Sequence, residues 1–192
     1  MQSRYEQLSA RFEMLKAQRS TWEPLWKRIR DYVAPDSGRF DSDRRDRGYN
    51  RYSKIIDATA VDALDTLAAG MQSGISSPAR QWFKLTTNDP KLDESIEVKQ
   101  FLEDTQRSMQ MLFARSDVYR ALHSTYFEMG AFGVGATLMT HGDKPGTIDC
   151  IPLTIGEFWL AEDFRGRIDT LYRQFKMTAI QMIRQWGEEA VS

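Results

Sequence analysis

The chain has 192 residues, of which 41% are hydrophobic, and a formal net charge of −1. A chain of this length is expected to form one domain, or one domain with an arm, around a true core. The near-neutral charge argues against a simple DNA-binding module, which usually carries a clear basic excess. The single cysteine, Cys150, excludes an internal disulfide and a zinc site built from several cysteines. No apolar run approaches the ~20 residues of a membrane-spanning helix, so no span is expected.

The sequence up to residue 33 predicts a helical arm that can sit apart from the main fold. Apolar residues recur there at helical spacings; they are Tyr5, Leu8, Phe12, Leu15, Trp22, Trp26, Ile29 and Val33. Ser20 followed by Glu23 matches the capping-box pattern, so the helix is expected to restart or kink near Ser20. Trp22 and Trp26 lie one turn apart. They are either core anchors within the chain or anchors of a subunit interface, where tryptophan is enriched.

Residues 34–52 predict a charged loop with few aliphatic side chains. Arginines alternate there with aromatic residues, a mixture that can bind phosphates or single strands; the arginines are Arg39, Arg44, Arg45, Arg47 and Arg51. Four aspartates offset most of this charge, so a solvated loop is the favoured interpretation. Contact with DNA or with a neighbouring subunit stays open, with Arg44, Arg45 and Arg47 as candidate subunit-interface residues.

Residues 57–85 combine a helix rich in small residues, a Gly/Ser/Pro corner and an aromatic strand. Gly70 and Gly74 lie four residues apart, which favours close helix packing near the end of this helix. Pro78 is expected to stop the helix, because proline lacks an N–H and biases its predecessor to extended geometry. Trp82 and Phe83 are then expected to anchor a short strand over residues 82–86. These five residues are candidate structural anchors.

Residues 53–192 are expected to form the main domain, in which helical spacing changes to strand-like runs after Gly130. Helices are predicted near 96–113 and from a cap at Ser116 or Asp117 to Gly130. Strands are predicted within 131–141 and near 147–151, 158–160 and 168–175, with a hairpin turn at 164–167. Thr178 and Gln181 match a capping box that opens a last helix, ended by Gly187. The predicted fold is α+β, with an N-terminal helical arm and helices packed on a small, mainly antiparallel sheet.

The sequence contains no recognisable pairing of a nucleophile with a base, so no enzyme activity, metal or cofactor is expected. One alternative is a metal-dependent phosphodiesterase whose candidate residues are Glu157, Asp163, Asp169 and His141. Their spacing does not place them on one face, and a solvated hairpin is the favoured interpretation. The other alternative is a monomeric DNA-binding adaptor that uses residues 39–51.

Four segments closely resemble the N-terminal region of the portal, or head-to-tail connector, proteins of short-tailed bacteriophages. They are WEPLWKRIRDYVAP, DATAVDALDTLAAGMQSGISSPARQWFKL, YRALHSTYFEMGAFGVGATLM and IPLTIGEFWLAEDFRGRIDTLYRQFKMT. The second and fourth are the most specific, because they combine several large aromatic residues with glycine and aspartate positions.

This resemblance implies a wing-like α+β domain in a structural protein. Family members form a ring of about twelve subunits, whose heterologous contacts close by rotation. Double-stranded DNA passes through the ring during packaging and ejection without base readout. The implied partners are the capsid protein, the packaging terminase and tail adaptor proteins. The implied location is the capsid vertex of the virion, after assembly in the bacterial host cytoplasm. Family members are usually several hundred residues long, so a stem and a clip are expected beyond this sequence.

Overall fold

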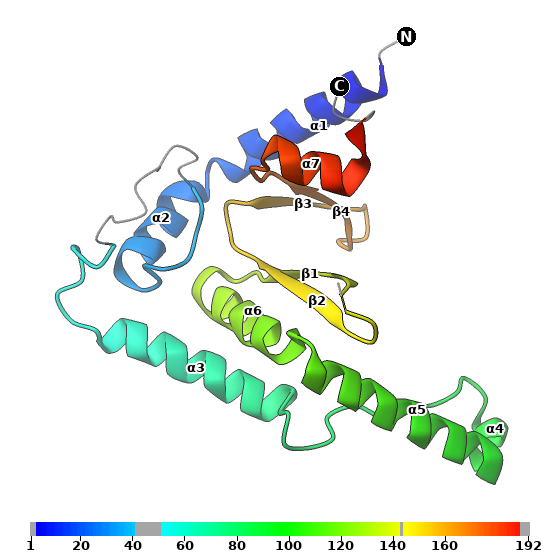
Figure 1. The fold of residues 1–192 in the computed structure, drawn as a ribbon. Helices are drawn as coiled ribbons and strands as arrows, with labels where there is room; N and C mark the ends of the chain where they lie inside the picture. Colours follow the sequence, from blue (N-terminus) through cyan, green and yellow to red (C-terminus); the bar gives the residue numbers. More distant parts are fainter. Residues whose placement is uncertain (1–2, 41–50, 143, 189–192) are drawn as a thin grey trace. The chain divides into compact units, whose positions relative to one another are not determined.

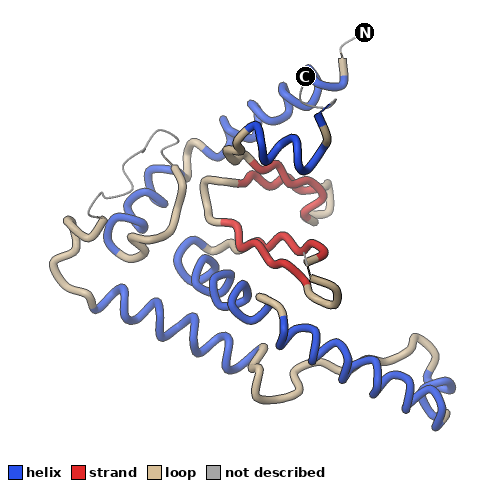
Figure 2. The backbone as a smooth tube through the Cα atoms, in the orientation of Figure 1, coloured by secondary structure: helices blue, strands red, loops and turns tan. Residues whose placement is uncertain are grey.

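The computed structural model describes residues 3–40, 51–142 and 144–188, and it has an α+β fold (Figure 1). The predicted fold class is confirmed, although the described strands form two separate antiparallel pairs. The chain divides into two compact units. One, here called the terminal unit, joins Met1–Glu23 to Gly156–Ser192, and the other, the central unit, is Pro24–Ile155. Each unit contains one strand pair (Figure 2). The domain boundaries predicted at residues 33 and 52, between the arm, the charged loop and the main domain, remain predictions.

The terminal unit combines the first helix of the chain with the second hairpin. Its elements are α1 (Arg4–Arg19), β3 (Phe158–Glu162), β4 (Ile168–Arg173) and α7 (Ala179–Trp186). Strands β3 and β4 pair in register from Phe158 opposite Arg173. Helix α1 packs on β3, where Leu15, Phe158 and Trp159 are buried. The α1 part of the predicted arm therefore belongs to a folded unit.

The predicted break in the helical arm is present. Helix α1 ends at Arg19, and α2 (Glu23–Tyr32) begins four residues later. The capping role predicted for Ser20 is wrong, because its hydroxyl donates to the Ala17 carbonyl at 2.6 Å and so ends α1. The Glu23 carboxylate accepts instead from the Arg19 guanidinium at 3.0 Å.

The central unit is organised around one helix. Its elements are α2, α3 (Thr59–Ile75), α4 (Pro90–Glu94), α5 (Ile96–Arg115), α6 (Val118–Phe132), β1 (Ala136–His141) and β2 (Ile148–Leu153). Helix α6 packs against α3 and against the β1–β2 hairpin, whose register runs from Ala136 opposite Leu153 to His141 opposite Ile148. Val118, Ala121 and Cys150 form a buried cluster between helix and hairpin. Such burial of apolar surface is the main stabilising contribution.

Two predicted elements differ from the structure. Residues 82–86 are not a strand, and they pair with none of the four described strands; the Leu85 N–H donates instead to the Gln106 side chain at 3.3 Å. The predicted helix end at Gly130 is also wrong. Helix α6 continues to Phe132, and Gly133 ends it with a φ of +80°, which glycine adopts without strain. The predicted turn at 164–167 and the Thr178–Gln181 capping box are confirmed.

Candidate functional site

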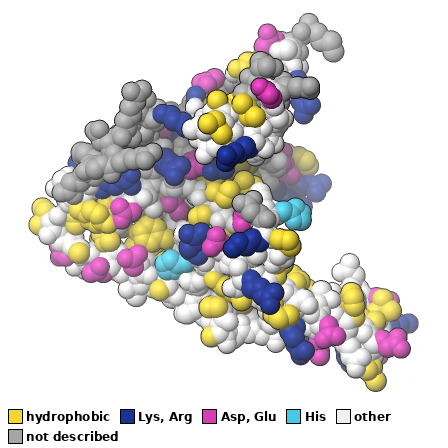
Figure 3. All heavy atoms as spheres, in the orientation of Figure 1, with side chains coloured by type: hydrophobic (Ala, Val, Ile, Leu, Met, Phe, Trp, Pro, Cys, Tyr) yellow, Lys and Arg dark blue, Asp and Glu magenta, His cyan; other side chains and the backbone are white. Residues whose placement is uncertain are grey.

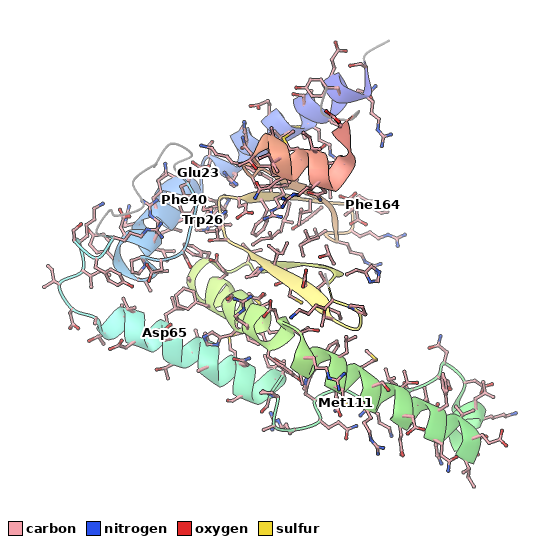
Figure 4. All side chains as sticks on the ribbon, in the orientation of Figure 1. Glu23, Trp26, Phe40, Asp65, Met111 and Phe164 are labelled. Atoms are coloured by element: carbon pink, nitrogen blue, oxygen red, sulfur yellow. The ribbon has the colours of Figure 1, made fainter. Side chains whose placement is uncertain are left out.

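The two tryptophans predicted as interface anchors have different surroundings. Trp22 follows α1 and is 57% exposed. Trp26, on α2, is half-buried and stacks on Phe40 at a centroid distance of 6.3 Å (Figure 4). Phe40 in turn meets the edge of Phe132 at the end of α6, also at 6.3 Å. Trp26 therefore makes a contact within the central unit, whereas Trp22 presents most of its surface to the surroundings.

The first part of the predicted charged loop is held in place. The Arg39 N–H donates to the Ile155 carbonyl at 2.8 Å, and the Gly38 N–H donates to the Thr154 hydroxyl at 2.7 Å. That hydroxyl donates to the Glu128 carboxylate at 2.8 Å, which also accepts from the Ile155 N–H at 3.1 Å. Glu128 is only 5% exposed, so these hydrogen bonds offset the loss of its hydration. The backbone of residues 38–39 is thus fixed against the end of β2, whereas the Arg39 side chain is exposed.

An electrostatic cluster joins α2 to the residues before α3. Asp31 accepts hydrogen bonds from Arg30 at 2.9 Å and from Lys54 at 2.5 Å. Burial alone would raise the pKa of Asp31, but the Lys54 and Arg30 hydrogen bonds outweigh it and hold this pKa below its ordinary value. The Tyr52 hydroxyl donates to the Asp36 carboxylate, which raises the pKa of Tyr52. The predicted contact residues Arg44, Arg45 and Arg47 lie outside the described residues.

The close approach of α3 and α6 occurs at a glycine that was predicted to end a helix. A Cβ added at Gly130 would lie 3.0 Å from Leu64 Cδ1 and 3.1 Å from Leu67 Cδ2. A Cβ added at Gly70 or Gly74 would meet nothing within 4 Å. The close helix packing predicted at Gly70 and Gly74 is therefore absent within the described chain, and Gly130 supplies it instead.

Polar side chains complete the contact between α3 and α6. The buried Ser76 hydroxyl and the Tyr126 hydroxyl share a hydrogen bond of 2.9 Å. The Gln72 amide donates to the Tyr119 carbonyl at 2.8 Å and lies 3.1 Å from His123 Nδ1. Hydrogen bonds between buried and half-buried polar groups favour one relative placement of two helices. The α3–α6 pair is thus a rigid element.

The corner after α3 is an aromatic cluster. Pro78 is exposed, and the neighbouring Arg80 donates to the Ser73 carbonyl at 2.9 Å and to the Gly74 carbonyl, which completes the helix end. Trp82 stacks on Phe113 at 6.2 Å, and its indole N–H donates to the Tyr119 hydroxyl at 3.3 Å. Phe83 lies 5.8 Å from the same Phe113 ring. Both aromatic residues are half-buried and connect the corner to α5 and α6.

The carboxylates considered for metal binding have separate structural roles. Glu157 accepts from the Arg173 guanidinium at 2.7 Å. Asp163 accepts the N–H groups of the hairpin turn, and Asp169 faces Arg11 at 3.8 Å. His141 is exposed in β1 of the other unit. Among residues 3–40, 51–142 and 144–188, no three His, Cys, Asp or Glu side chains form a group that could hold a metal ion. Nothing in this geometry favours the phosphodiesterase alternative.

Two further observations concern chemistry and membranes. Burial raises the pKa of the Cys150 thiol, and the nearby Asp117 and Asp149 act in the same direction. The thiol is thus disfavoured as a nucleophile. Within the described residues, the helices are too short or too polar for any of them to cross a membrane.

Comparison with known proteins places these features in a family context. A family model described as bacteriophage head to tail connecting protein matches residues 5–192. The chain is 45% identical, over 185 residues, to a probable portal protein of Bordetella phage BPP-1; the match covers 96% of this chain and 33% of that protein. It is 39% identical, over 187 residues, to the portal protein of Salmonella phage epsilon15, covering 97% and 34% respectively. The chain spans about a third of the length of these relatives. The resemblance seen in the sequence segments is confirmed.

Proposed function

The chain belongs to the family of bacteriophage head to tail connecting proteins, and from this membership we propose that it is the wing-like part of a portal subunit. The subunits form a closed ring at the capsid vertex, through which DNA passes during packaging and ejection. The observation that carries this proposal is the 45% and 39% identity, over nearly the whole chain, to two proteins named as portal proteins. The role is structural and not enzymatic.

The physical character of the chain supports a scaffold role. The α3–α6 pair is joined by buried hydrogen bonds and by a glycine contact, so it can transmit load without rearranging. The near-zero net charge also fits a ring that lets DNA slide. A strongly basic surface would hold phosphates through the release of counterions and would slow the passage.

We assign the contact between neighbouring subunits in part to the outer surface of α1 and to Trp22. Tyr5 is 77% exposed, Met14 is 54% exposed and Trp22 is 57% exposed. Exposed aromatic and Met side chains of this kind are enriched at interfaces between proteins. Trp26 and the arginines Arg44, Arg45 and Arg47 remain proposed contacts of the same interface. A ring of about twelve copies, closed by heterologous contacts, is the proposed assembly. The proposed partners are the capsid protein, the packaging terminase and tail adaptors, with assembly in the host cytoplasm.

A chimaera tests this proposal. This chain replaces the matching third of the probable portal protein of Bordetella phage BPP-1, and the purified product is imaged by electron microscopy. We expect closed rings with a central channel. A chimaera that is folded by circular dichroism but stays monomeric contradicts the proposal. Deleting α1 is not a usable test, because Leu15 is part of the buried core of the terminal unit. Trp22→Ala on the chimaera is the sharper variant, and we expect it to weaken the rings without unfolding the subunit.

A further inference from the structure

The hairpin of the terminal unit ends in an exposed phenylalanine. Phe164 lies at the tip between β3 and β4 and is 91% exposed (Figure 4). No other large hydrophobic side chain in the described part of this unit is as exposed. Exposing a whole phenylalanine ring to water is unfavourable, and the guanidinium of its neighbour Arg165 lies 5.0 Å from the ring centre. An exposed aromatic ring of this kind is typical of an anchor for a partner.

The tip is rigid. Asp163 Oδ1 accepts from the N–H groups of Arg165 at 2.7 Å and Arg167 at 2.9 Å. The Asp163 backbone adds hydrogen bonds to Arg167 and Gly166, and Gly166 has a φ of +73°. Because the turn is already ordered, a partner that binds Phe164 does not have to order the turn as well.

The charges beside the ring define the kind of partner. Arg165 lies 5.0 Å from the centre of the Phe164 ring, and the side chains of Arg165 and Arg167 are both exposed. Three carboxylates lie within the same hairpin: Glu162, Asp163 and Asp169. Asp163 is bonded to the N–H groups of the turn and Asp169 lies 3.8 Å from Arg11, so Arg165 and Arg167 are the main charges that the tip presents. Two arginines are too few for the sustained basic surface that duplex DNA requires. An exposed apolar ring with two exposed arginines in the same turn fits a protein surface that is acidic and made of short side chains.

One helix of this same chain has such a surface. No lysine or arginine occurs between residues 55 and 79, and Asp62, Asp65 and Ala69 lie three and four residues apart on one exposed face of α3. Neither carboxylate has an ion-pair partner in the described parts of the chain. The adjacent Gly70 has open space where a Cβ would be, so a ring can approach the helix. Figure 3 shows acidic and hydrophobic side chains over the first half of α3.

Other acidic residues match less well. Helix α5 carries both signs along its exposed surface, with Glu97 near Lys99 and Glu103 near Arg107. A mixed surface gives little net attraction for two arginines, because unlike neighbours cancel at a distance.

We propose that the Phe164–Arg167 tip of one copy binds the Asp62–Asp65 face of α3 in a second copy. This inference rests on the proposed portal function and names two surfaces of its ring contact. Tip and face are different patches, so the contact is heterologous and can close into a ring.

Charge reversal on both sides tests the proposal in the 192-residue chain. One variant carries Arg165→Glu and Arg167→Glu, and the other carries Asp62→Lys and Asp65→Lys. Association is measured by sedimentation equilibrium over a range of concentrations. We expect the wild-type chain to associate weakly, each variant alone to lose association, and an equal mixture of the two to regain it. The difference in association between the wild type and each variant should shrink at about 1 M salt, where charges are screened beyond ~3 Å.

Two matched controls separate this contact from a general charge effect. Glu97→Lys with Glu103→Lys makes the same charge change on α5 and should leave association unchanged. Phe164→Ala should weaken association about tenfold or more, as loss of an interface anchor does, whereas Phe101→Ala, which removes a ring that is 68% exposed on α5, should not.

Three outcomes overturn the inference. The first is a wild-type chain that stays monomeric at millimolar concentration. The second is a mixture of reversed variants that does not regain association. The third is binding of duplex DNA that is lost in the tip variant and kept in the α3 variant, since the tip would then contact DNA. If the chimaera forms rings that tolerate both reversals, the inference fails and the proposed function stands. If the wild-type chimaera forms no rings, the proposed function fails.

Discussion

The central and terminal units are stabilised in different ways. In the central unit, α6 packs mainly through apolar side chains and neutral hydrogen bonds such as Ser76 to Tyr126, with one buried carboxylate, Glu128. In the terminal unit, the buried hydrophobic side chains are Leu15, Phe158 and Trp159, and charged groups lie directly beside them. A small core buries a smaller fraction of its surface, so each contact carries more of the stability.

The charged groups of the terminal unit are closely packed. The Arg19 guanidinium lies 3.9 Å from the centre of the Trp159 ring and donates to the Phe158 carbonyl at 3.0 Å. Burial lowers the pKa of Arg19, and the hydrogen bond and charge of Glu23 oppose this. The buried Trp159 Nε1 has no hydrogen-bond partner within the described part of the chain, which is unfavourable. The terminal unit should therefore be the more easily unfolded of the two.

Phe158→Ala should have the largest effect. Phe158 is 2% exposed in the small core, and loss of such a ring costs about 3–5 kcal/mol. We expect hydrogen exchange of β3 and β4 to become fast while α6 stays protected. Phe164→Ala on the same hairpin is the control, and its free energy of unfolding should change by no more than about 0.5 kcal/mol. Equal loss of protection in α6 would mean that the units unfold together.

Glu157→Gln should have the next largest effect. The Glu157 side chain is 3% exposed, and a hydrogen bond between charged groups contributes about 1.5–3 kcal/mol. Chemical denaturation should show a loss in this range. Glu162→Gln removes an exposed carboxylate of the same hairpin and should be nearly neutral. Comparable losses of unfolding free energy in both variants would show that the buried Glu157–Arg173 contact does not stabilise the core more than an exposed carboxylate does.

Gly130→Ala tests the α3–α6 contact of the central unit. The added Cβ would press on Leu64 and Leu67, which offsets the helix preference of alanine. Gly70→Ala adds the same atom in open space and should stabilise α3 by up to about 1 kcal/mol. We expect the Gly130 variant to unfold at least about 1 kcal/mol more easily than the Gly70 variant. If the Gly70 variant unfolded more easily than the Gly130 variant, the close α3–α6 contact would not lie at Gly130.

Sequence patterns predicted the elements whose signals are local. The Thr178–Gln181 cap, the hairpin turn after Asp163 and the break near Ser20 all depend on residues within a few positions of each other. The strand at 82–86 was wrong because a strand needs a partner, and the partner of Leu85 is the side chain of Gln106, 21 residues away.

The candidate site was harder to predict for the same reason. Glycine spacing on α3 indicated close packing, but it could not show that α3 meets α6 through Leu64 and Leu67, at Gly130 of α6. The buried Glu128 was missed as well. Its one signal was a lone acidic residue among Tyr126, Phe127, Met129 and Phe132, and its partner Thr154 is 26 residues away.

Asp31→Asn should have the smallest effect. The pKa of Asp31 is lower in the folded chain than its ordinary value of about 3.9, so its charge stabilises the fold above that pH. The stabilisation is lost as the pH falls through the folded pKa. The wild type should be more stable than the variant by about 1 kcal/mol or less at pH 7, and the difference should close in acid below about pH 4. A stability difference between the wild type and the variant that grows as the pH falls would contradict this prediction.

The central claim is that this chain is a structural part of a closed portal ring. Electron cryomicroscopy of the chimaera with the Bordetella phage BPP-1 protein tests it most directly, because one map shows both the ring and the contacts between its subunits. The account predicts a closed ring in which the Phe164 hairpin of each copy lies against α3 of the next copy. A well-folded chimaera that forms no closed ring would contradict the account.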